Sequence, residues 1–192
     1  GFSYGYNRNE TLADYHTGRQ LLLMLIDIVS RGGNFLLDIG PRADGHIPVA
    51  MAERLSQIGD WLRPHGEAIY GTKAWDRSAQ WSAGEMPHFE QKEFRAAYNI
   101  TKMVDHPPPG YAHVEVFFAS KDGAVYAIVP HRPKGDLVLR DFAASAQTHL
   151  TLLHPEHQLQ WHARDRDLVV SLPDALPRQE AYVIKMSGVR SA

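Results

Sequence analysis

A single apolar stretch, GGNFLLDIGPRADG at residues 32–45, restricts the fold more than any other part of the sequence. Its run from Asn34 to Ile39 does not alternate with polar residues, and Gly40-Pro41 closes it. Such a run predicts a strand that is covered on both faces, as strands of parallel sheets are. One parallel strand cannot form a sheet, so it needs neighbours of a kind that the rest of the chain does not offer.

Helical patterns flank this expected strand. From Thr17 to Arg31 apolar residues recur at helical spacing, with Thr17 placed to cap the start and Gly32 to end the helix. A second helix is expected to begin at Pro48 and to stop at Pro64, because proline suits the first helical position and disrupts a helix interior. Its apolar positions are Met51, Leu55, Ile58 and Leu62.

The order helix, strand, helix is typical of the last unit of a repeated β-α pattern, in either a doubly wound sheet or an eight-stranded barrel. In both folds ligands bind at the carboxyl ends of the strands, which places Asp38 and the loop 40–45 near a site. The glycines Gly32 and Gly33 precede the strand, which is the wrong side for a phosphate-binding turn. A nucleotide-binding fold is therefore disfavoured.

The remainder of the chain has a different pattern. Short β-rich runs are separated by turns, and Lys121-Asp122-Gly123 between two of them predicts a hairpin. This spacing favours an antiparallel β-sandwich, so we expect an α/β part at residues 1–74 and an all-β part at residues 75–192, with the boundary near Trp75. The expected strands are 113–120, 124–130, 136–142, 148–154, 159–165, 167–173 and 180–187.

Composition excludes several classes of function. A formal net charge of -2 over 192 residues gives no basic field for nucleic acid or an anionic membrane. The longest apolar run, Leu21 to Ile26, is too short to cross a bilayer. The absence of cysteine excludes disulfides, thiolate metal sites and a cysteine nucleophile, but it does not identify a compartment.

Four linked motifs resemble those found in the C-terminal part of the α-L-fucosidases, a family of glycoside hydrolases. They lie in SYGYNRNE at residues 3–10, GGNFLLDIGP and DGHIP within residues 32–48, and GEAIY at residues 66–70, in the family's order and at about its spacing. The resemblance is strong over residues 1 to about 75 and only general over the β part.

The resemblance answers the question of the isolated strand. It implies that residues 34–39 form the last strand of a (β/α)8-type catalytic barrel, which is followed by the family's C-terminal β-sandwich. It also implies a retaining mechanism in which one carboxylate attacks the anomeric carbon and another protonates the leaving oxygen. Both carboxylates are expected upstream of this chain, so no catalytic residue is assigned here, and no cofactor is expected.

One residue of this chain is expected to bind substrate. Tyr4 stands where the family has an aromatic residue, usually Trp or Phe, whose ring would pack on the apolar face of fucose. Asp38 replaces the family's Asn; it could hold a site residue by a hydrogen bond, although a structural cap or a pair with an arginine is favoured. Glu67 also matches a family position, but it follows the second helix, away from the barrel mouth, so a structural role is favoured.

Eleven histidines raise the question of a metal site, especially His149, His154 and His157. None of them combines with a carboxylate at the helical or strand spacing that a zinc site uses, and His154-Pro155 indicates a turn. No metal is therefore expected.

The sequence thus predicts a fragment of an exo-acting α-L-fucosidase. Two alternatives remain open: a carbohydrate-binding or scaffolding β-sandwich without activity of its own, and a barrel glycosidase of different sugar specificity. The expected partners are a fucosylated glycan or glycoside and the upstream barrel segment, with an oligomer left open and with neither nucleic acid nor membrane. A secreted, periplasmic or lysosomal location is favoured over the cytoplasm.

Overall fold

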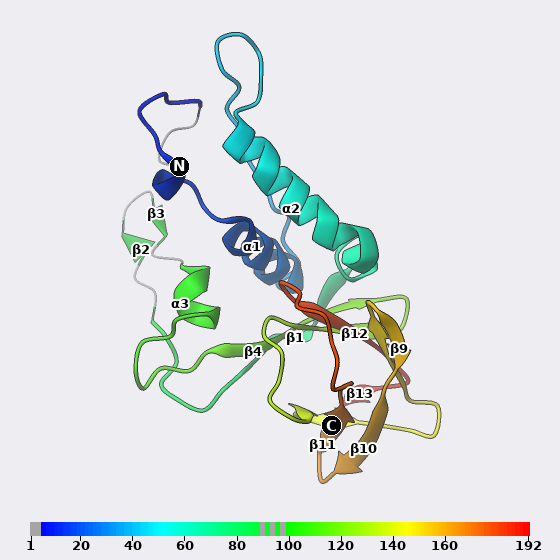
Figure 1. Cartoon of the computed structure of the whole chain (residues 1–192). Coiled ribbons are helices and arrows are strands. Elements are labelled where there is room, and N and C mark those ends of the chain that lie inside the picture. Colours follow the sequence, from blue (N-terminus) through cyan, green and yellow to red (C-terminus); the bar gives the residue numbers. More distant parts are fainter. Residues whose placement is uncertain (1–4, 89–90, 93–94, 97–98) are drawn as a thin grey trace.

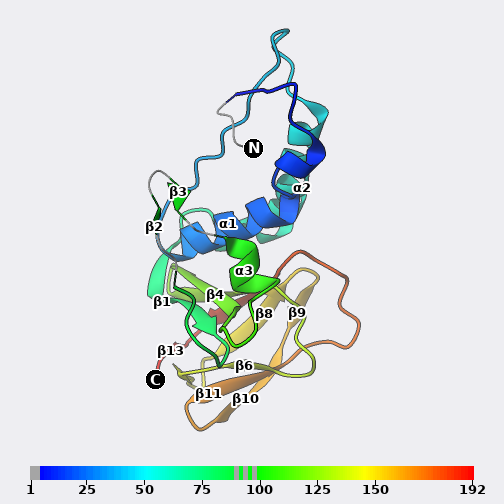
Figure 2. The ribbon, with the colours of Figure 1, turned by 90° about the vertical axis from the view of Figure 1, so that its left-hand side faces the viewer.

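The computed structural model describes residues 5–88, 91–92, 95–96 and 99–192. A helical part lies on one side of a β part, as both views of the ribbon show (Figures 1 and 2). No helix among the described residues is long and apolar enough to cross a membrane. The helices are η1 (Leu12–Asp14), α1 (Gly18–Ser30), α2 (Val49–His65), η2 (Gly66–Ala68) and α3 (Ile100–Val104).

The β part consists of antiparallel sheets. Its strands are β1 (Lys73–Trp81), β2 (Gln91–Lys92), β3 (Arg95–Ala96), β4 (Val114–Lys121), β5 (Ala124–Val129), β6 (Leu137–Leu139), β7 (Phe142–Ala143), β8 (His149–Leu153), β9 (Glu156–Gln158), β10 (Gln160–Arg164), β11 (Asp167–Ser171), β12 (Tyr182–Ser187) and β13 (Arg190–Ser191). Within the described residues the largest sheet has the order β1-β4-β5-β12-β8-β9, and a second has the order β10-β11-β6. The pairs β13-β7 and β2-β3 form two-stranded ribbons.

The local signals for α1 are confirmed. The Thr17 hydroxyl accepts a hydrogen bond from the Gln20 backbone N–H at 3.1 Å, and the Gln20 side chain accepts one from the Thr17 N–H at 2.9 Å. This reciprocal capping box satisfies two N–H groups that the first turn of a helix leaves free. At the other end the chain leaves the helix through Gly32, whose φ of 79° favours glycine.

The second helix forms as expected, but its apolar positions are buried unequally. Pro48 is the residue before the first helical residue, and Pro64 lies in the last turn rather than ending the helix. Ile58 is buried at 8% exposure, whereas Leu55 is 39% exposed. The reason is geometric, since only the C-terminal half of α2 reaches the sheet, and its other end extends away from the β part (Figure 1).

The expected strand at Asn34–Ile39 is not present. These residues form no strand ladder with any described residue, and the Leu36 side chain is 92% exposed. The prediction of a strand covered on both faces is therefore wrong for this structure. A β-strand is held by hydrogen bonds to a neighbour, and the described part of the chain places none beside this segment.

The hairpin signal at residues 121–123 is confirmed. Lys121 pairs with Ala124, and the two turn residues Asp122 and Gly123 have φ values of 50° and 77°. Positive φ at both positions matches the twist of an antiparallel hairpin, and Asp-Gly adopts it at low cost. The turn expected at His154-Pro155 is also present, since Leu153 pairs with Glu156 across it.

Two hydrophobic cores lie on opposite faces of the six-stranded sheet. In β5, Val125, Ala127 and Val129 face the first core, which the smaller sheet completes. Their neighbours Ala124, Tyr126 and Ile128 face the second core, which residues of α1, α2 and α3 complete. Because side chains alternate along a strand, a strand between two covered faces is apolar throughout. The helices therefore form a third layer over the sandwich (Figure 2).

Residues 76–112 gave no clear pattern in the sequence, and the structure places part of β1 and all of α3 there. β1 pairs with β4, and α3 contributes Ile100, Met103 and Val104 to the second core. The helical part and the sheet share this core. The boundary between two domains near Trp75 therefore stays a prediction.

Candidate functional site

The first and second motifs meet in space, although they are far apart in the sequence. Tyr4 lies outside the described residues, but Gly5 and Tyr6 follow it and their backbone lies against Gly40. Gly40 is buried at this contact, and Tyr6 is 41% exposed. The contact therefore brings the start of the described chain to the end of the segment 34–39.

The loop 41–47 holds its shape through its own hydrogen bonds. The Arg42 N–H donates to the His46 carbonyl at 2.9 Å, and the Gly45 N–H donates to the Arg42 carbonyl at 2.9 Å. The His46 N–H donates to the Asp44 carboxylate at 3.1 Å, and the Arg42 guanidinium lies 3.1 Å from the same group. The His46 N–H, followed by Arg42, lowers the pKa of Asp44, so this exposed carboxylate stays charged at neutral pH.

The segment between Tyr6 and α1 is fixed in a similar way. The Asp14 carboxylate accepts from the Thr11 N–H at 2.7 Å and from its hydroxyl at 2.9 Å, and these two bonds lower the pKa of Asp14. Burial, followed by a hydrogen bond with Glu10, raises the pKa of Tyr15. The Arg54 side chain of α2 donates to the His16 carbonyl at 3.1 Å, which ties the segment to the second helix.

The two acidic residues from the motifs have different environments. Asp38 is exposed and forms no hydrogen bond or ion pair with another described residue, so neither role considered for it is observed. Glu67 pairs with Lys185 of β12 at 3.4 Å. Burial alone would lower the pKa of Lys185, but Tyr126 and Glu67 outweigh it and raise that pKa. The favoured structural role of Glu67 agrees with this link between η2 and the sheet.

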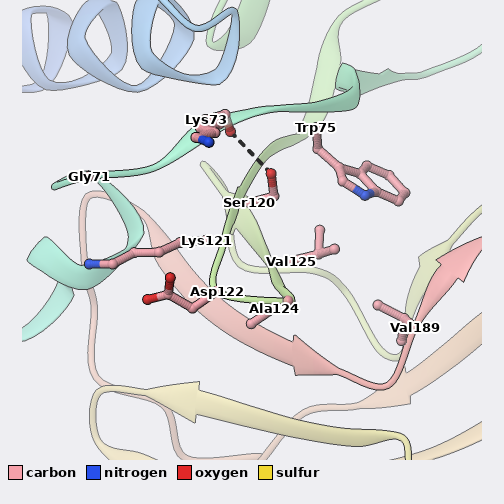
Figure 3. A pocket seen from close by; sticks show the side chains of 10 residues that line it. Gly71, Lys73, Trp75, Ser120, Lys121, Asp122, Ala124, Val125 and Val189 are labelled. Atoms are coloured by element: carbon pink, nitrogen blue, oxygen red, sulfur yellow. Dashed lines mark hydrogen bonds between the residues drawn. The ribbon is translucent and has the colours of Figure 1, made fainter.

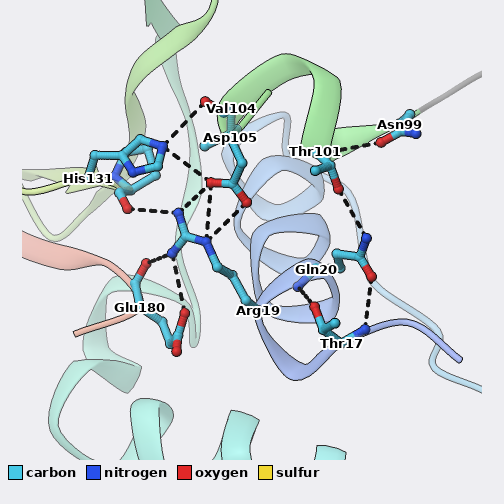
Figure 4. Close-up of polar contacts among 10 residues, drawn as sticks. Thr17, Arg19, Gln20, Asn99, Thr101, Val104, Asp105, His131 and Glu180 are labelled. Atoms are coloured by element: carbon cyan, nitrogen blue, oxygen red, sulfur yellow. Dashed lines mark hydrogen bonds and ion pairs between the residues drawn. The ribbon is translucent and has the colours of Figure 1, made fainter. Parts of the chain in front are cut away.

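A polar junction that the sequence did not reveal joins α1, α3 and the sheet (Figure 4). The Arg19 guanidinium donates to the Asp105 carboxylate from Nη2 at 2.6 Å and from Nε at 3.1 Å, and Glu180 lies on its other side. Nη2 of Arg19 also donates to the Pro130 carbonyl at 3.1 Å. Burial alone would lower the pKa of Arg19, but Asp105 and then Glu180 raise it. The junction holds the helical layer in register with the sheet.

A buried histidine lies at the end of α2. His65 is 1% exposed, its Nδ1 lies 2.9 Å from the Trp61 carbonyl, and its ring stacks on the Trp61 ring at 4.8 Å between centroids. Its Nε2 forms no hydrogen bond of normal geometry with a described residue, although the Gln179 side chain lies near enough to raise the His65 pKa as the smallest of its causes. Burial, only partly offset by the Trp61 carbonyl, lowers the pKa of His65 from its ordinary value of 6.5.

We expect this histidine to make folding sensitive to acid. The unfolded chain binds a proton at His65 near pH 6.5 and the folded chain only at lower pH, so its contribution to stability is complete above pH 6.5 and is lost as the pH falls below that value. His65→Phe keeps the ring stack and removes the titration. Between pH 7.5 and 5.5, Tm should therefore fall more for the wild-type chain than for the variant. Equal falls in thermal unfolding scans would contradict the assignment.

Among the described residues, the β part has hollows at two places that are candidates for a ligand site. The first, of about 320 Å³, lies between residues that include Lys73, Trp75, Lys121 and Val189 (Figure 3). Lys121 donates to the Tyr70 carbonyl at 2.9 Å, and the Trp75 ring stacks on Phe142 at 4.7 Å. These side chains already serve the fold, so we assign this hollow no ligand.

The second hollow, of about 350 Å³, is lined by Gln80, Glu115 and Arg140 among others. Arg140 forms an ion pair with Glu115 at 2.7 Å. The Gln80 amide nitrogen donates to the Glu115 carboxylate and to the Val138 carbonyl, and its amide oxygen accepts from the Arg140 backbone N–H. These three side chains bind one another and the backbone of β6 and Arg140, so we assign this hollow no ligand.

The described residues contain no group of three or more histidine and acidic side chains placed to hold a metal ion. His154 lies in the turn between β8 and β9, His157 is the middle residue of β9 and His149 begins β8, and all three side chains are exposed. The region around Gly40, where the segments of the first and second motifs meet, is the candidate site, and it consists of backbone and loop contacts rather than a charged cluster.

Comparison with known proteins gives matches over nearly the whole chain. A family model described as alpha-L-fucosidase matches residues 1–67, and one described as alpha-L-fucosidase C-terminal domain matches residues 111–187. Tissue alpha-L-fucosidase of Homo sapiens is 35% identical over 98% of this chain, and alpha-L-fucosidase of Branchiostoma floridae is 36% identical over 97%. The match covers 35% and 36% of those proteins, so the chain spans about a third of their length.

Solved structures agree with these matches. The crystal structure of Thermotoga maritima alpha-fucosidase in complex with fucose superimposes with a TM-score of 0.72 and 30% identity, over 97% of this chain and 38% of that one. A bacterial fucosidase at 22% identity superimposes with a TM-score of 0.68 and supports the fold alone. These neighbours confirm the fold class expected from the sequence, a fragment of the end of a (β/α)8-type barrel followed by an antiparallel β-sandwich, although the barrel fragment has helices but no strand among its described residues.

Proposed function

Because the chain belongs to the family of α-L-fucosidases and carries their C-terminal domain, we propose that it is part of an exo-acting enzyme that releases terminal α-L-fucose with retention. The observation that carries this proposal is the match of both its helical and its β part, in order, to one family. The relatives and solved structures named above are all fucosidases. Neither a β-sandwich without activity of its own nor a barrel glycosidase of different sugar specificity is therefore favoured.

In this proposal the chain contributes to the sugar site but does not supply the reacting groups. The nucleophile and the acid/base carboxylate lie in the two thirds of the relatives' length that the chain does not span. Tyr4 presents its ring to the apolar face of fucose, and the packing of Gly5 and Tyr6 on Gly40 supports its place at the barrel mouth. The substrate is a fucosylated glycan or glycoside, and fucose is the ligand named for the Thermotoga maritima protein.

The remainder of the barrel is the second proposed partner. Several apolar side chains on the helical part have no apolar neighbour to cover them: Leu12 is 65% exposed, Leu36 is 92% exposed and Val49 is 75% exposed. Leu12 and Leu36 lie on the segments before α1 and α2, and Val49 is the first residue of α2. This end of α2 extends away from the β part (Figure 1). A contiguous barrel sheet and its helices would cover such residues and pair the backbone of residues 34–39. A location outside the cytoplasm is part of the proposal.

The proposal predicts that the 192-residue chain alone does not hydrolyse an aryl α-L-fucoside. An incomplete barrel leaves the segment 34–39 unpaired and lacks both carboxylates. Release of the aryl group should therefore equal that of a heat-killed control, while the full-length protein at the same concentration releases it. Turnover by the short chain above that control would contradict the assignment of both carboxylates to the upstream part. An inactive full-length protein would contradict the proposed function itself.

A further inference from the structure

The contact at Gly40 leaves no room for a side chain. A Cβ atom built on Gly40 would lie 2.2 Å from the backbone nitrogen of Tyr6, 2.5 Å from the carbonyl carbon of Gly5 and 2.8 Å from its Cα. All three neighbours are backbone atoms, which cannot move aside by a change of rotamer. Relief of the clash therefore requires the backbone of Gly5–Tyr6 and that of Gly40 to move apart, because Cβ atoms do not approach heavy atoms closer than 3.0 Å.

Glycine is required here for space and not for backbone conformation. Gly40 is not among the glycines with positive φ, so alanine can adopt its backbone angles. Gly45, in the same loop, has the opposite properties, since its φ is 82° and nothing lies within 4 Å of its added Cβ. Alanine substitutions at Gly40 and at Gly45 therefore separate the effect of a steric clash from the effect of a strained backbone angle.

The position of Gly5 and Tyr6 depends on this packing. Neither residue forms a hydrogen bond with another described residue, whereas the segment after them is held by the Thr11–Asp14 capping box. Close packing against Gly40 is therefore a contact that helps to place these two residues.

We propose that Gly40 is a positioning residue for the substrate-binding segment that begins at Tyr4. This inference rests on the proposed function. A side chain at Gly40 moves the Gly5–Tyr6 backbone by on the order of 1 Å, and a misplacement of that size in a binding group costs on the order of 100-fold in rate. In this proposal Gly40 acts through the backbone of Gly5 and Tyr6 and is not a catalytic residue.

The test compares Gly40→Ala with two control variants in the full-length protein. Gly45→Ala disturbs the same loop without pressing on Gly5 and Tyr6, and Gly59→Ala adds a methyl group to α2 where nothing lies within 4 Å. We expect Gly40→Ala to lower kcat/KM for an aryl α-L-fucoside by about 10- to 100-fold. Its Tm should stay within a few degrees of wild type, because Gly40 belongs to neither core.

Hydrogen–deuterium exchange of peptides covering residues 5–17 supplies a second measurement that needs no activity. Exchange should be faster in Gly40→Ala than in wild type and in both controls, and unchanged in peptides of α1. Faster exchange together with lower kcat/KM supports the proposal. Unchanged exchange overturns the packing role whatever the activity, and faster exchange with full activity overturns the link to the sugar site. If the wild-type full-length protein is inactive, the proposed function fails, while the exchange result still decides the role of the contact.

Discussion

Truncation of Tyr4 to alanine in the full-length protein is expected to lower kcat/KM for an α-L-fucoside by about 10- to 100-fold, or about 1.5–3 kcal/mol. The physical reason is the loss of an aromatic surface from the apolar face of the sugar and the entry of water in its place. Stability should change little, since the place proposed for Tyr4, at the barrel mouth, is outside a core. Steady-state kinetics and a thermal unfolding scan of the same preparation check both parts.

Two substitutions at the same position separate the ring from the hydroxyl. Tyr4→Phe and Tyr4→Trp should keep most of the activity, because the argument uses the ring alone. Tyr70 offers a matched control, since its side chain is 61% exposed and lies next to η2, away from the candidate site. Tyr70→Ala should leave kcat/KM unchanged. An unaltered Tyr4→Ala enzyme, or a Tyr4→Phe enzyme as impaired as Tyr4→Ala, would show that Tyr4 is not a sugar platform.

Replacement of Arg19 by leucine is expected to lower the free energy of unfolding by about 2–4 kcal/mol. The Asp105 side chain is only 14% exposed, and without Arg19 its contact among the described ionisable residues is the His131 ring, whose Nε2 lies 3.2 Å away (Figure 4). The Pro130 carbonyl also loses its donor. For a chain of this size such a change lowers Tm by roughly 4–16 °C, which calorimetry measures directly.

Three comparisons make this second prediction specific. Arg63→Leu removes an exposed pair with Asp60 on α2, at 75% and 63% side-chain exposure, and should change Tm little. Arg19→Lys should fall between wild type and Arg19→Leu, because an ammonium cannot reproduce the two parallel bonds to the carboxylate. Removal of both charges, in Arg19→Leu with Asp105→Leu, should recover part of the loss. A double variant that is less stable than the sum of the two single changes would contradict a pairwise junction.

The sequence was most informative where a local chemical rule determines the structure. Thr17 with Gln20 begins α1, Asp122-Gly123 forms a two-residue turn, and the apolar runs after residue 112 form antiparallel strands close to their expected bounds. Each of these features depends on residues that are near one another in the chain. The family resemblance came from motifs of the same kind, and the comparisons confirm it.

The sequence was least informative where distant segments meet. It predicted a strand at Asn34–Ile39 from apolar character, but pairing depends on a neighbour and not on the segment itself. It gave no sign that Arg19 would reach Asp105, or that His65 would be buried on Trp61. A polar residue in a sequence does not say which other residue it will face.

Taken by itself, the sequence determined the helical and β parts, the turns, the helix caps and the family, because each is encoded in spacing or in short motifs. Only the tertiary structure decided that the helices cover the second face of the six-stranded sheet, so that Tyr126 and Ile128 become core residues. It also decided why Gly40 must be glycine, since the atoms that exclude a side chain belong to Gly5 and Tyr6. Close packing is a property of surfaces brought together by folding, and it depends on distances that no local pattern contains.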